Sequence, residues 1–148
     1  MDRSTQIRPL QSGDRAQWDA LWSGYLTFYA QDLPPAVTDA TWRRLVDPDQ
    51  DLHGLGVLDL DGAMVGFVHY LFHPVTWSDG VRCYLEDLFV AETARGLGAG
   101  HALVNAVYAA ADARAADQVY WFTHASNTTA RKLYDRVGQL TPFVKYRR

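Results

Sequence analysis

The feature that most constrains this chain is a glycine run, Arg95-Gly96-Leu97-Gly98-Ala99-Gly100, placed between a strand-like and a helix-like segment. Residues 81–90 before it (VRCYLEDLFV) are rich in aliphatic and aromatic side chains, as strands are. The residues after it place apolar side chains on one helix face, namely Leu103, Val104, Val107, Tyr108 and Ala111. Alternating glycines let backbone amides approach a ligand, and the free N–H groups of a helix N-terminus attract anions. The run therefore predicts a phosphate-binding turn, to which Arg95 adds a permanent positive charge.

Glycine-rich phosphate turns occur in several classes of nucleotide-binding protein, and the spacing here excludes two of them. A P-loop requires a lysine directly after the last glycine, followed by serine or threonine, and the chain has none. A dinucleotide-binding oxidoreductase domain requires G-x-G-x-x-G after the first strand, whereas this chain has G-x-G-x-G about two-thirds of the way along. A helix start that only needs close packing would explain a single glycine. Three glycines directly after an arginine favour an anion site.

Two segments of the chain resemble the GNAT superfamily of N-acetyltransferases. Arg95-x-x-Gly98-x-Gly100 matches the R/Q-x-x-G-x-G/A signature, which in that family follows the fourth strand and cradles the pyrophosphate of acetyl-coenzyme A. Residues 127–138 (NTTARKLYDRVG) match the second cofactor segment, N-x-x-A-x-x-L-Y-x-x-x-G. The resemblance covers residues 81–138 well and is closest to the diamine, polyamine and yeast-type histone acetyltransferases. It implies an acetyl-coenzyme A-dependent N-acetyltransferase that uses acetyl-coenzyme A as co-substrate and no metal.

The whole length fits one domain. The chain has 148 residues, of which 48% are hydrophobic, and this is enough to build a core without cross-links. We predict a single α/β (α+β) domain over residues 1–148, which the resemblance describes as a mixed, mostly antiparallel, twisted sheet flanked by about four helices. The expected order is β-α-α-β-β-β-α-β-α-β, with a hairpin at Asp61-Gly62. The expected strands cover residues 6–10, 55–60, 63–72, 81–90, 118–124 and 143–146, and the expected helices begin at Ser12, Thr38, the glycine run and Ser126.

Two adjacent carboxylates, Glu86 and Asp87, interrupt the otherwise apolar strand of residues 81–90. A charged group in a central strand is costly unless it is paired or used. Regular alternation predicts two faces, one with Tyr84, Glu86 and Leu88 and the other with Leu85, Asp87 and Phe89. We interpret Asp87 as a structural carboxylate paired with Arg82 or with a neighbouring strand. Glu86 matches the base that the resemblance implies, because a primary amine, with a reference pKa around 10.4, must lose a proton before it attacks a thioester.

The resemblance also implies an acid, an oxyanion donor and a set of cofactor contacts. Tyr134 matches the tyrosine that protonates the leaving thiolate, although a core tyrosine on an amphipathic helix is the alternative interpretation. The backbone amide of Phe89 or Val90 matches the donor to the tetrahedral oxyanion. The expected cofactor-binding residues are Leu88, Phe89, Val90, Arg95, Gly96, Leu97, Gly98, Ala99, Gly100, Asn127 and Tyr134.

Aromatic residues recur at the end of the first expected helix, where Tyr25, Phe28 and Tyr29 lie at helical spacing. Core packing and an aromatic wall for the acceptor explain this pattern equally well, since aromatic faces attract cationic amines. The predicted acceptor-binding residues are therefore Tyr25, Tyr29 and Glu86. His69 and His73 have no third ligand at a metal-binding spacing, so we predict no metal site.

Composition limits the location and the partners of the protein. A net charge of −3 argues against nucleic acid and is compatible with a cationic substrate. No segment reads as a signal peptide or a membrane span, so we expect a cytoplasmic protein with no membrane partner. The single cysteine, Cys83, excludes an internal disulfide.

The expected acceptor is a small amine, polyamine or amino-acid-like molecule, with a protein lysine as the alternative. A homodimer is a candidate assembly. A non-catalytic acyl-coenzyme A sensor or interaction module is the rival function; it would keep the glycine turn without needing Glu86 and Tyr134.

Overall fold

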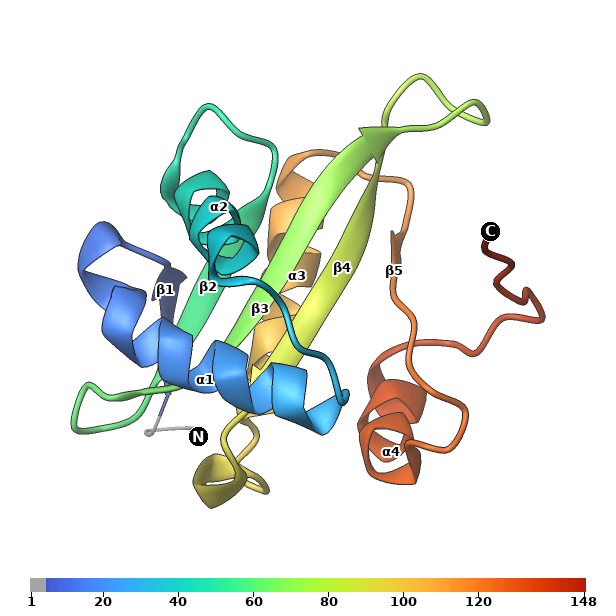
Figure 1. The fold of residues 1–148 in the computed structure, drawn as a ribbon. Coiled ribbons are helices and arrows are strands. Elements are labelled where there is room, and N and C mark those ends of the chain that lie inside the picture. Colours follow the sequence, from blue (N-terminus) through green and yellow to red (C-terminus); the bar gives the residue numbers. More distant parts are fainter. Residues whose placement is uncertain (1–4) are drawn as a thin grey trace.

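The strands of this protein form one five-stranded sheet and lie in it in chain order (Figure 1). The computed structural model describes residues 5–148. The strands are β1 (Gln6–Pro9), β2 (His53–Leu58), β3 (Met64–Pro74), β4 (Val81–Val90) and β5 (Val119–Tyr120). Neighbouring strands are antiparallel, except that β4 and β5 are parallel. The sheet is therefore mixed and mostly antiparallel, as the sequence predicts.

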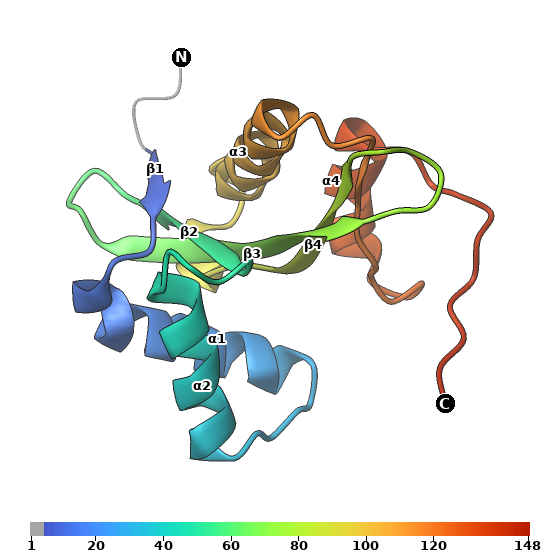
Figure 2. The same ribbon diagram turned by 90° about the horizontal axis from the view of Figure 1, so that it is seen from above.

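Helices cover both faces of the sheet (Figure 2). They are α1 (Arg15–Phe28), α2 (Pro35–Val46), α3 (Ala99–Ala113) and α4 (Thr128–Val137), with short 3-10 turns at Ser12–Asp14 and Glu92–Ala94. The helices α1 and α2 lie on one face, and α3 lies on the other with α4 beside it near β5. Among residues 5–148, none of these helices is both long and apolar enough to cross a membrane.

Each face of the sheet has its own apolar core. On the α1 and α2 face, Trp18 and Phe67 are fully buried at its centre. On the α3 face, the helix buries Leu103, Val104 and Val107 against the strands. Residues spaced three and four apart on α3 thus share one buried side, which is the periodicity that predicts this helix from the sequence. The two cores fix the sheet between its helices and leave the β5 edge for a site.

The strand β4 contains an extra residue, and this changes which side chains share a face. His69 of β3 pairs with Asp87, but the next residue, Tyr70, pairs with Leu85, so Glu86 is left without a partner as a β-bulge. Beyond a bulge the in–out alternation of a strand is reset. Relative to Tyr84 and Leu85, the faces that regular alternation predicts for Asp87, Leu88 and Phe89 are therefore wrong.

Three helix starts differ from those expected, and the smallest difference is at α4, which begins at Thr128 instead of Ser126. Ser12 opens a 3-10 turn rather than α1, because Asp14 bonds to Arg8 and to the backbone N–H of Gln11 and so takes the position just before the helix. The second helix begins at Pro35 instead of near Thr38. Proline at the first helical position loses no hydrogen bond, so Pro34-Pro35 ends one segment and also starts the next helix.

The predicted final strand over residues 143–146 is wrong. Within residues 5–148 they pair with no strand, and Phe143 and Tyr146 are largely exposed. The residues have high β propensity, but a strand exists only where another strand supplies its hydrogen bonds. The predicted strand over residues 118–124 is reduced to β5, because only Val119 and Tyr120 reach β4.

Candidate functional site

The strands β4 and β5 separate partway along their length, and this separation opens the sheet edge. Within the described residues their ladder contains the pairs Cys83–Val119 and Tyr84–Tyr120, after which β4 continues to Val90 while the chain after Tyr120 leaves the sheet. A strand edge without a neighbour presents alternate N–H and C=O groups. The predicted oxyanion donors, Phe89 and Val90, lie on this open stretch, and so does Leu88.

The glycine turn follows this open stretch and leads directly into α3. Gly96 and Gly98 have φ angles of 83° and 82°, in the left-handed region that disfavours side chains, and Gly98 is the residue just before α3. The first N–H groups of a helix have no partner within it, so the turn presents backbone donors at the positive end of α3. Gly100 has a different role, because a Cβ there would lie 3.1 Å from a methyl group of Leu133 in α4.

The other predicted residues of the turn contribute in different ways. The side chain of Ala99 packs in the α3 core, which leaves only its backbone for a ligand, and Leu97 is exposed. The guanidinium of Arg95 folds back to the end of β4: its Nε donates to the carbonyl of Val90 at 3.1 Å, and its centre lies 5.8 Å from the ring of Phe89. Arg95 also borders a groove of about 410 Å³ between the turn and α1, lined by Ser23, Gly24, Thr27, Phe28, Phe89 and Glu92.

Asp87 is the centre of a hydrogen-bonded chain that joins α1 to the two middle strands. Its Oδ1 accepts a bond of 2.6 Å from the hydroxyl of Tyr25, and its Oδ2 lies 2.9 Å from Nδ1 of His69. The indole N–H of Trp18 lies 3.1 Å from the other ring nitrogen of His69. Trp18 and His69 are fully buried, so these bonds replace solvent contacts that the folded chain has removed.

The chain of bonds determines where the proton of His69 lies. An indole N–H is a donor only, so Nε2 of His69 accepts from Trp18 and Nδ1 carries the proton. Nδ1 then donates to Asp87, whose two oxygens are thus both used as acceptors. Trp18, His69 and Asp87 thus form one chain of donors and acceptors that runs from the indole to the carboxyl group.

Glu86, the bulge residue, lies on the same face as Asp87. Its carboxylate lies near the hydroxyl of Tyr84, and it acts electrostatically on Tyr25 as Asp87 does. Partial burial and then the charge of Asp87 raise the pKa of Glu86, whereas the charge of Lys145 and the nearby Tyr84 hydroxyl lower it. Although protein atoms partly surround its carboxylate, the Glu86 residue is exposed to solvent by surface area. Unlike Asp87, whose two oxygens are both bonded, Glu86 therefore retains acceptor capacity for another molecule.

Aromatic hydroxyls surround the acidic pair. The ring of Tyr25 lies 4.9 Å from that of Tyr29, and Tyr29 stacks on His124 at 5.9 Å. The ring of Tyr134 in α4 packs edge-on against Trp121 at 5.4 Å. Burial and then the proximity of Tyr29 raise the pKa of Tyr134 to about 12, so its hydroxyl keeps its proton through the neutral range. The pKa of Tyr25 lies well above its usual range because of burial and the charge of Asp87.

The structure brings together most of the residues that the sequence singled out and corrects how the acids lie. Regular alternation placed Glu86 and Asp87 on opposite faces, but the bulge puts both on the α1 face, while Leu85 and Leu88 both pack in the α3 core. Asp87 pairs with the neighbouring strand β3 through His69, and a neighbouring strand is one of the two partners that the sequence suggested for it. The other expected partner, Arg82, binds Asp117 instead.

Sequence reasoning missed two members of the buried chain, Trp18 and His69. The sequence presents His69 as a metal-ligand candidate without a third ligand, and it gives no sign that Trp18 has a polar partner. The available signal was a lone histidine inside the apolar run GFVHYLF of β3, since a fully buried polar ring needs partners on both nitrogens. Asn127, predicted as a cofactor contact, lies just before α4, and its side chain accepts from the N–H of Ala130 at 3.3 Å.

Comparison with known proteins gives one sequence family and one fold. The sequence model of the acetyltransferase (GNAT) family matches residues 16–139. The D-amino-acid N-acetyltransferase HPA3 of Saccharomyces cerevisiae is 36% identical over 143 residues, which are 96% of this chain and 89% of that protein.

Solved structures share the fold at lower sequence identity. A ribosomal-protein-alanine N-acetyltransferase from Brucella melitensis biovar Abortus 2308 is 22% identical, with a TM-score of 0.80 and 96% of each chain covered. The structure of AAC(6')-Iy in complex with the bisubstrate analogue CoA-S-monomethyl-acetylneamine is 20% identical, with a TM-score of 0.83 and 97% of each chain covered.

The buried hydrogen bonds of Trp18, His69 and Asp87 lead to a prediction about stability. Replacing Trp18 with Phe removes the donor to His69 and leaves a buried ring nitrogen unsatisfied. The free energy of unfolding should therefore fall by about 1–3 kcal/mol more than in a matched aromatic truncation. Trp22→Phe is the match, because Trp22 packs in the same core while its indole N–H makes a longer, 3.3 Å bond to Thr38. Urea unfolding of both variants measures the difference.

A second measurement tests the tautomer itself. Nitrogen-15 spectra of the histidine rings should show the Nδ1–H form for His69 in the unmodified chain and a mixture of tautomers in Trp18→Phe. Equal stability losses in the two tryptophan variants, with the His69 spectrum unchanged, would contradict this arrangement.

Proposed function

Because the chain belongs to the acetyltransferase (GNAT) family, we propose that it transfers acetyl from acetyl-coenzyme A directly to the primary amine of a small acceptor. The chain is an N-acetyltransferase; the acceptor, the ternary complex and the residue roles are what we add. The observation that carries the proposal is the juxtaposition at the β5 edge. The open stretch of β4, the glycine turn at the start of α3 and the acidic pair at the bulge are parts of one continuous segment, residues 85–100.

In the proposed complex, the backbone N–H groups of the turn bind the pyrophosphate of acetyl-coenzyme A. The φ angles of Gly96 and Gly98 keep side chains away from these donors, and the α3 N-terminus adds a favourable dipole. Arg95 supplies a positive charge beside the turn. The thioester then lies along the open edge of β4, where the N–H of Phe89 or Val90 stabilises the oxyanion. Other members of the expected cofactor set, including Leu88, Leu97 and Asn127, border this path.

The acceptor side carries the opposite charge. Glu86 and Asp87 lie on one face with the rings of Tyr25, Tyr29 and Tyr84, an acidic and aromatic setting that attracts a protonated amine. The two oxygens of Asp87 are already bonded, so this carboxylate contributes a fixed negative charge. An amino-acid-like acceptor also agrees with the name of the yeast relative, a D-amino-acid N-acetyltransferase.

We propose the following proton path. Glu86 accepts a proton from the bound ammonium, directly or through water, because it is the carboxylate with free acceptor capacity. The amine lone pair attacks the thioester carbon and the C–N bond forms. As the C–S bond breaks, the nitrogen loses its second proton to water and coenzyme A leaves as the thiolate. The hydroxyl of Tyr134 donates to the leaving sulfur. Because burial raises the pKa of Tyr134 to about 12, above the roughly 8.5 of a thiol, hydrogen-bond donation contributes more than full proton transfer.

A binding and turnover experiment tests the proposal as a whole. The protein should bind coenzyme A in calorimetry and release free thiol from acetyl-coenzyme A when amines, polyamines or amino acids are supplied. Gly98→Ala should weaken cofactor binding by about tenfold or more, because a side chain at φ 82° strains the turn by about 1–3 kcal/mol.

Gly62→Ala is the matched control for this variant. Gly62 has the same φ of 82° but lies in the hairpin between β2 and β3, so the variant should lose stability without losing cofactor affinity. Tight cofactor binding with no turnover on any acceptor would favour the rival interpretation, a non-catalytic acyl-coenzyme A sensor. If cofactor affinity fell equally in both variants, the glycine turn would not be part of the cofactor site.

Tyr134→Phe tests the donor to the leaving group. The variant should lower kcat by about 100-fold, the low end of what a positioned acid contributes, with little change in the KM of the acceptor. Since the pKa of Tyr134 is raised to about 12, the unmodified enzyme should show no loss of activity from this group below about pH 11.

Tyr108→Phe serves as its control, because the Tyr108 hydroxyl donates to the carbonyl of Val137 at 2.6 Å on the α3 side of the sheet. This variant should keep kcat. An unchanged kcat in Tyr134→Phe would exclude Tyr134 as the donor to the leaving sulfur.

Glu86→Gln tests the base. Activity should rise with pH as Glu86 deprotonates, and burial and Asp87 move that rise above the ordinary carboxyl range. In Glu86→Gln the amine must lose its proton to solvent, so half-maximal kcat/KM should move to higher pH, toward the pKa of the acceptor itself. Stopped assays between pH 5 and 10 give the two profiles, and superimposable profiles would count against Glu86 as the base.

A further inference from the structure

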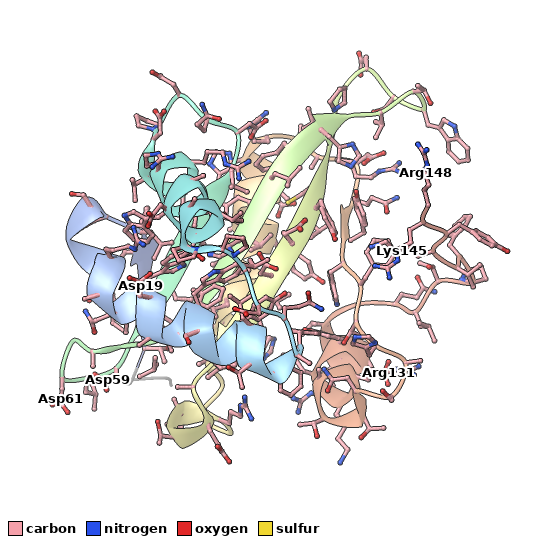
Figure 3. The ribbon with its side chains drawn as sticks, in the orientation of Figure 1. Asp19, Asp59, Asp61, Arg131, Lys145 and Arg148 are labelled. Carbon is pink, nitrogen blue, oxygen red and sulfur yellow. The ribbon has the colours of Figure 1, made fainter. Side chains whose placement is uncertain are left out.

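The chain after α4 returns to the acceptor side of the sheet. Residues 139–148 leave α4 on the α3 side, pass the β5 edge and end on the α1 and α2 side (Figure 2). Lys145 lies in this tail beside β5 (Figure 3). Its ammonium sits 5.0 Å from the ring centre of Phe122, in the segment just after β5.

Phe122 belongs to an aromatic patch that leads directly to the bulge. Its ring lies 6.0 Å from Tyr84 and 6.1 Å from Tyr120, and the rings of Tyr84 and Tyr120 stack at 4.9 Å. The hydroxyl of Tyr84 in turn lies near the carboxylate of Glu86, whose charge helps to raise the pKa of Tyr84. The cation in the tail and the acid at the bulge therefore lie at two borders of the same aromatic surface, and the charge of Lys145 acts on Glu86.

Lys145 is free to bind another anion. No ion pair within 4.0 Å joins it to a carboxylate in the described part of the chain, and its aromatic contact leaves its hydrogen-bond donors unused. Other basic residues near the sheet are engaged: Arg82 forms two bonds to Asp117, Arg95 bonds to Val90 and Arg131 bonds to Ala125.

An α-amino acid has charges that match this arrangement. Its ammonium and carboxylate are attached to the same carbon atom, so both must be accommodated close together. The acidic pair Glu86 and Asp87 attracts the ammonium and repels the carboxylate, which on its own would favour amines that lack a carboxylate. A cation at another border of the same aromatic surface, such as Lys145, offsets that repulsion.

We propose that Lys145 binds the carboxylate of an α-amino acid acceptor whose ammonium faces Glu86 and Asp87. This inference rests on the proposed function, because it assigns the acceptor class of the same site. Lys145 is then a specificity residue. It touches the part of the acceptor that does not react, so its removal should change KM more than kcat.

The test uses matched acceptors that differ only in the carboxylate. The full chain, its Lys145→Ala and Lys145→Glu variants, and acetyl-coenzyme A are assayed with D-phenylalanine, L-phenylalanine and phenethylamine. The assays are run on the alkaline plateau of the pH profile, where loss of Lys145 no longer changes the ionisation of Glu86. There Lys145→Ala should raise the KM for an accepted enantiomer by about tenfold, the size expected for one charged hydrogen bond, while leaving phenethylamine unchanged. Lys145→Glu should lower activity on the amino acid further.

Arg147→Ala provides the matched control, since it removes one positive charge from the same tail two residues away. It should leave the ratio of amino acid to amine activity unchanged, which separates a local contact from the general charge of the tail. Equal effects of Lys145→Ala on the amino acid and on phenethylamine would overturn the inference, and so would an equal effect of Arg147→Ala.

The outcomes also separate this inference from the proposed function. Turnover of phenethylamine without turnover of either amino acid overturns the role of Lys145 and leaves N-acetylation of small amines standing. Absence of turnover on every acceptor, with coenzyme A still bound, overturns both.

Discussion

The placement of one carboxylate, Asp87, is the constraint on which the rest of the site depends. A carboxylate inside a sheet is costly unless donors bind it, and the donors to Asp87 are Tyr25 of α1 and His69 of β3. Trp18 completes the chain from α1. These bonds tie α1 to β3 and β4, so they set where the first helix lies and which of its aromatic side chains face the acidic pair. In the proposed function, stability and acceptor binding therefore depend on the same contacts.

The bulge at Glu86 adds the second acid to this arrangement. A regular strand would have turned Glu86 away from Asp87, whereas the extra residue keeps both on the α1 face and returns Leu88 to the α3 core. The bulge also lies just beyond the last pairs between β4 and β5, where the sheet edge opens. One local irregularity thus coincides with the acidic pair and with the exposed backbone that a thioester requires.

The two ends of the open segment suit ligands of opposite charge. The glycine turn presents N–H groups and the positive end of α3, which suits a pyrophosphate, whereas the bulge presents carboxylates, which suit an ammonium. In the proposed reaction this separation orients the two substrates before any bond forms, and positioning of this kind is a large part of what an acyl transferase contributes. Lys145 adds a third charge where the tail reaches the acceptor side.

The sequence by itself determined the local features of this protein. The glycine spacing, the α3 periodicity, the Asp61-Gly62 hairpin and the two family segments each depend on residues close together in the chain, so the fold and the N-acetyltransferase class could be predicted from them. Only the tertiary structure decided the bulge, the partners of Asp87 and the course of residues 139–148. These depend on contacts between distant segments: His69 meets Asp87 across a ladder whose register no local pattern reveals. Phe143 and Tyr146 have strand propensity, yet they remain outside the sheet because no neighbouring strand is there to pair with them.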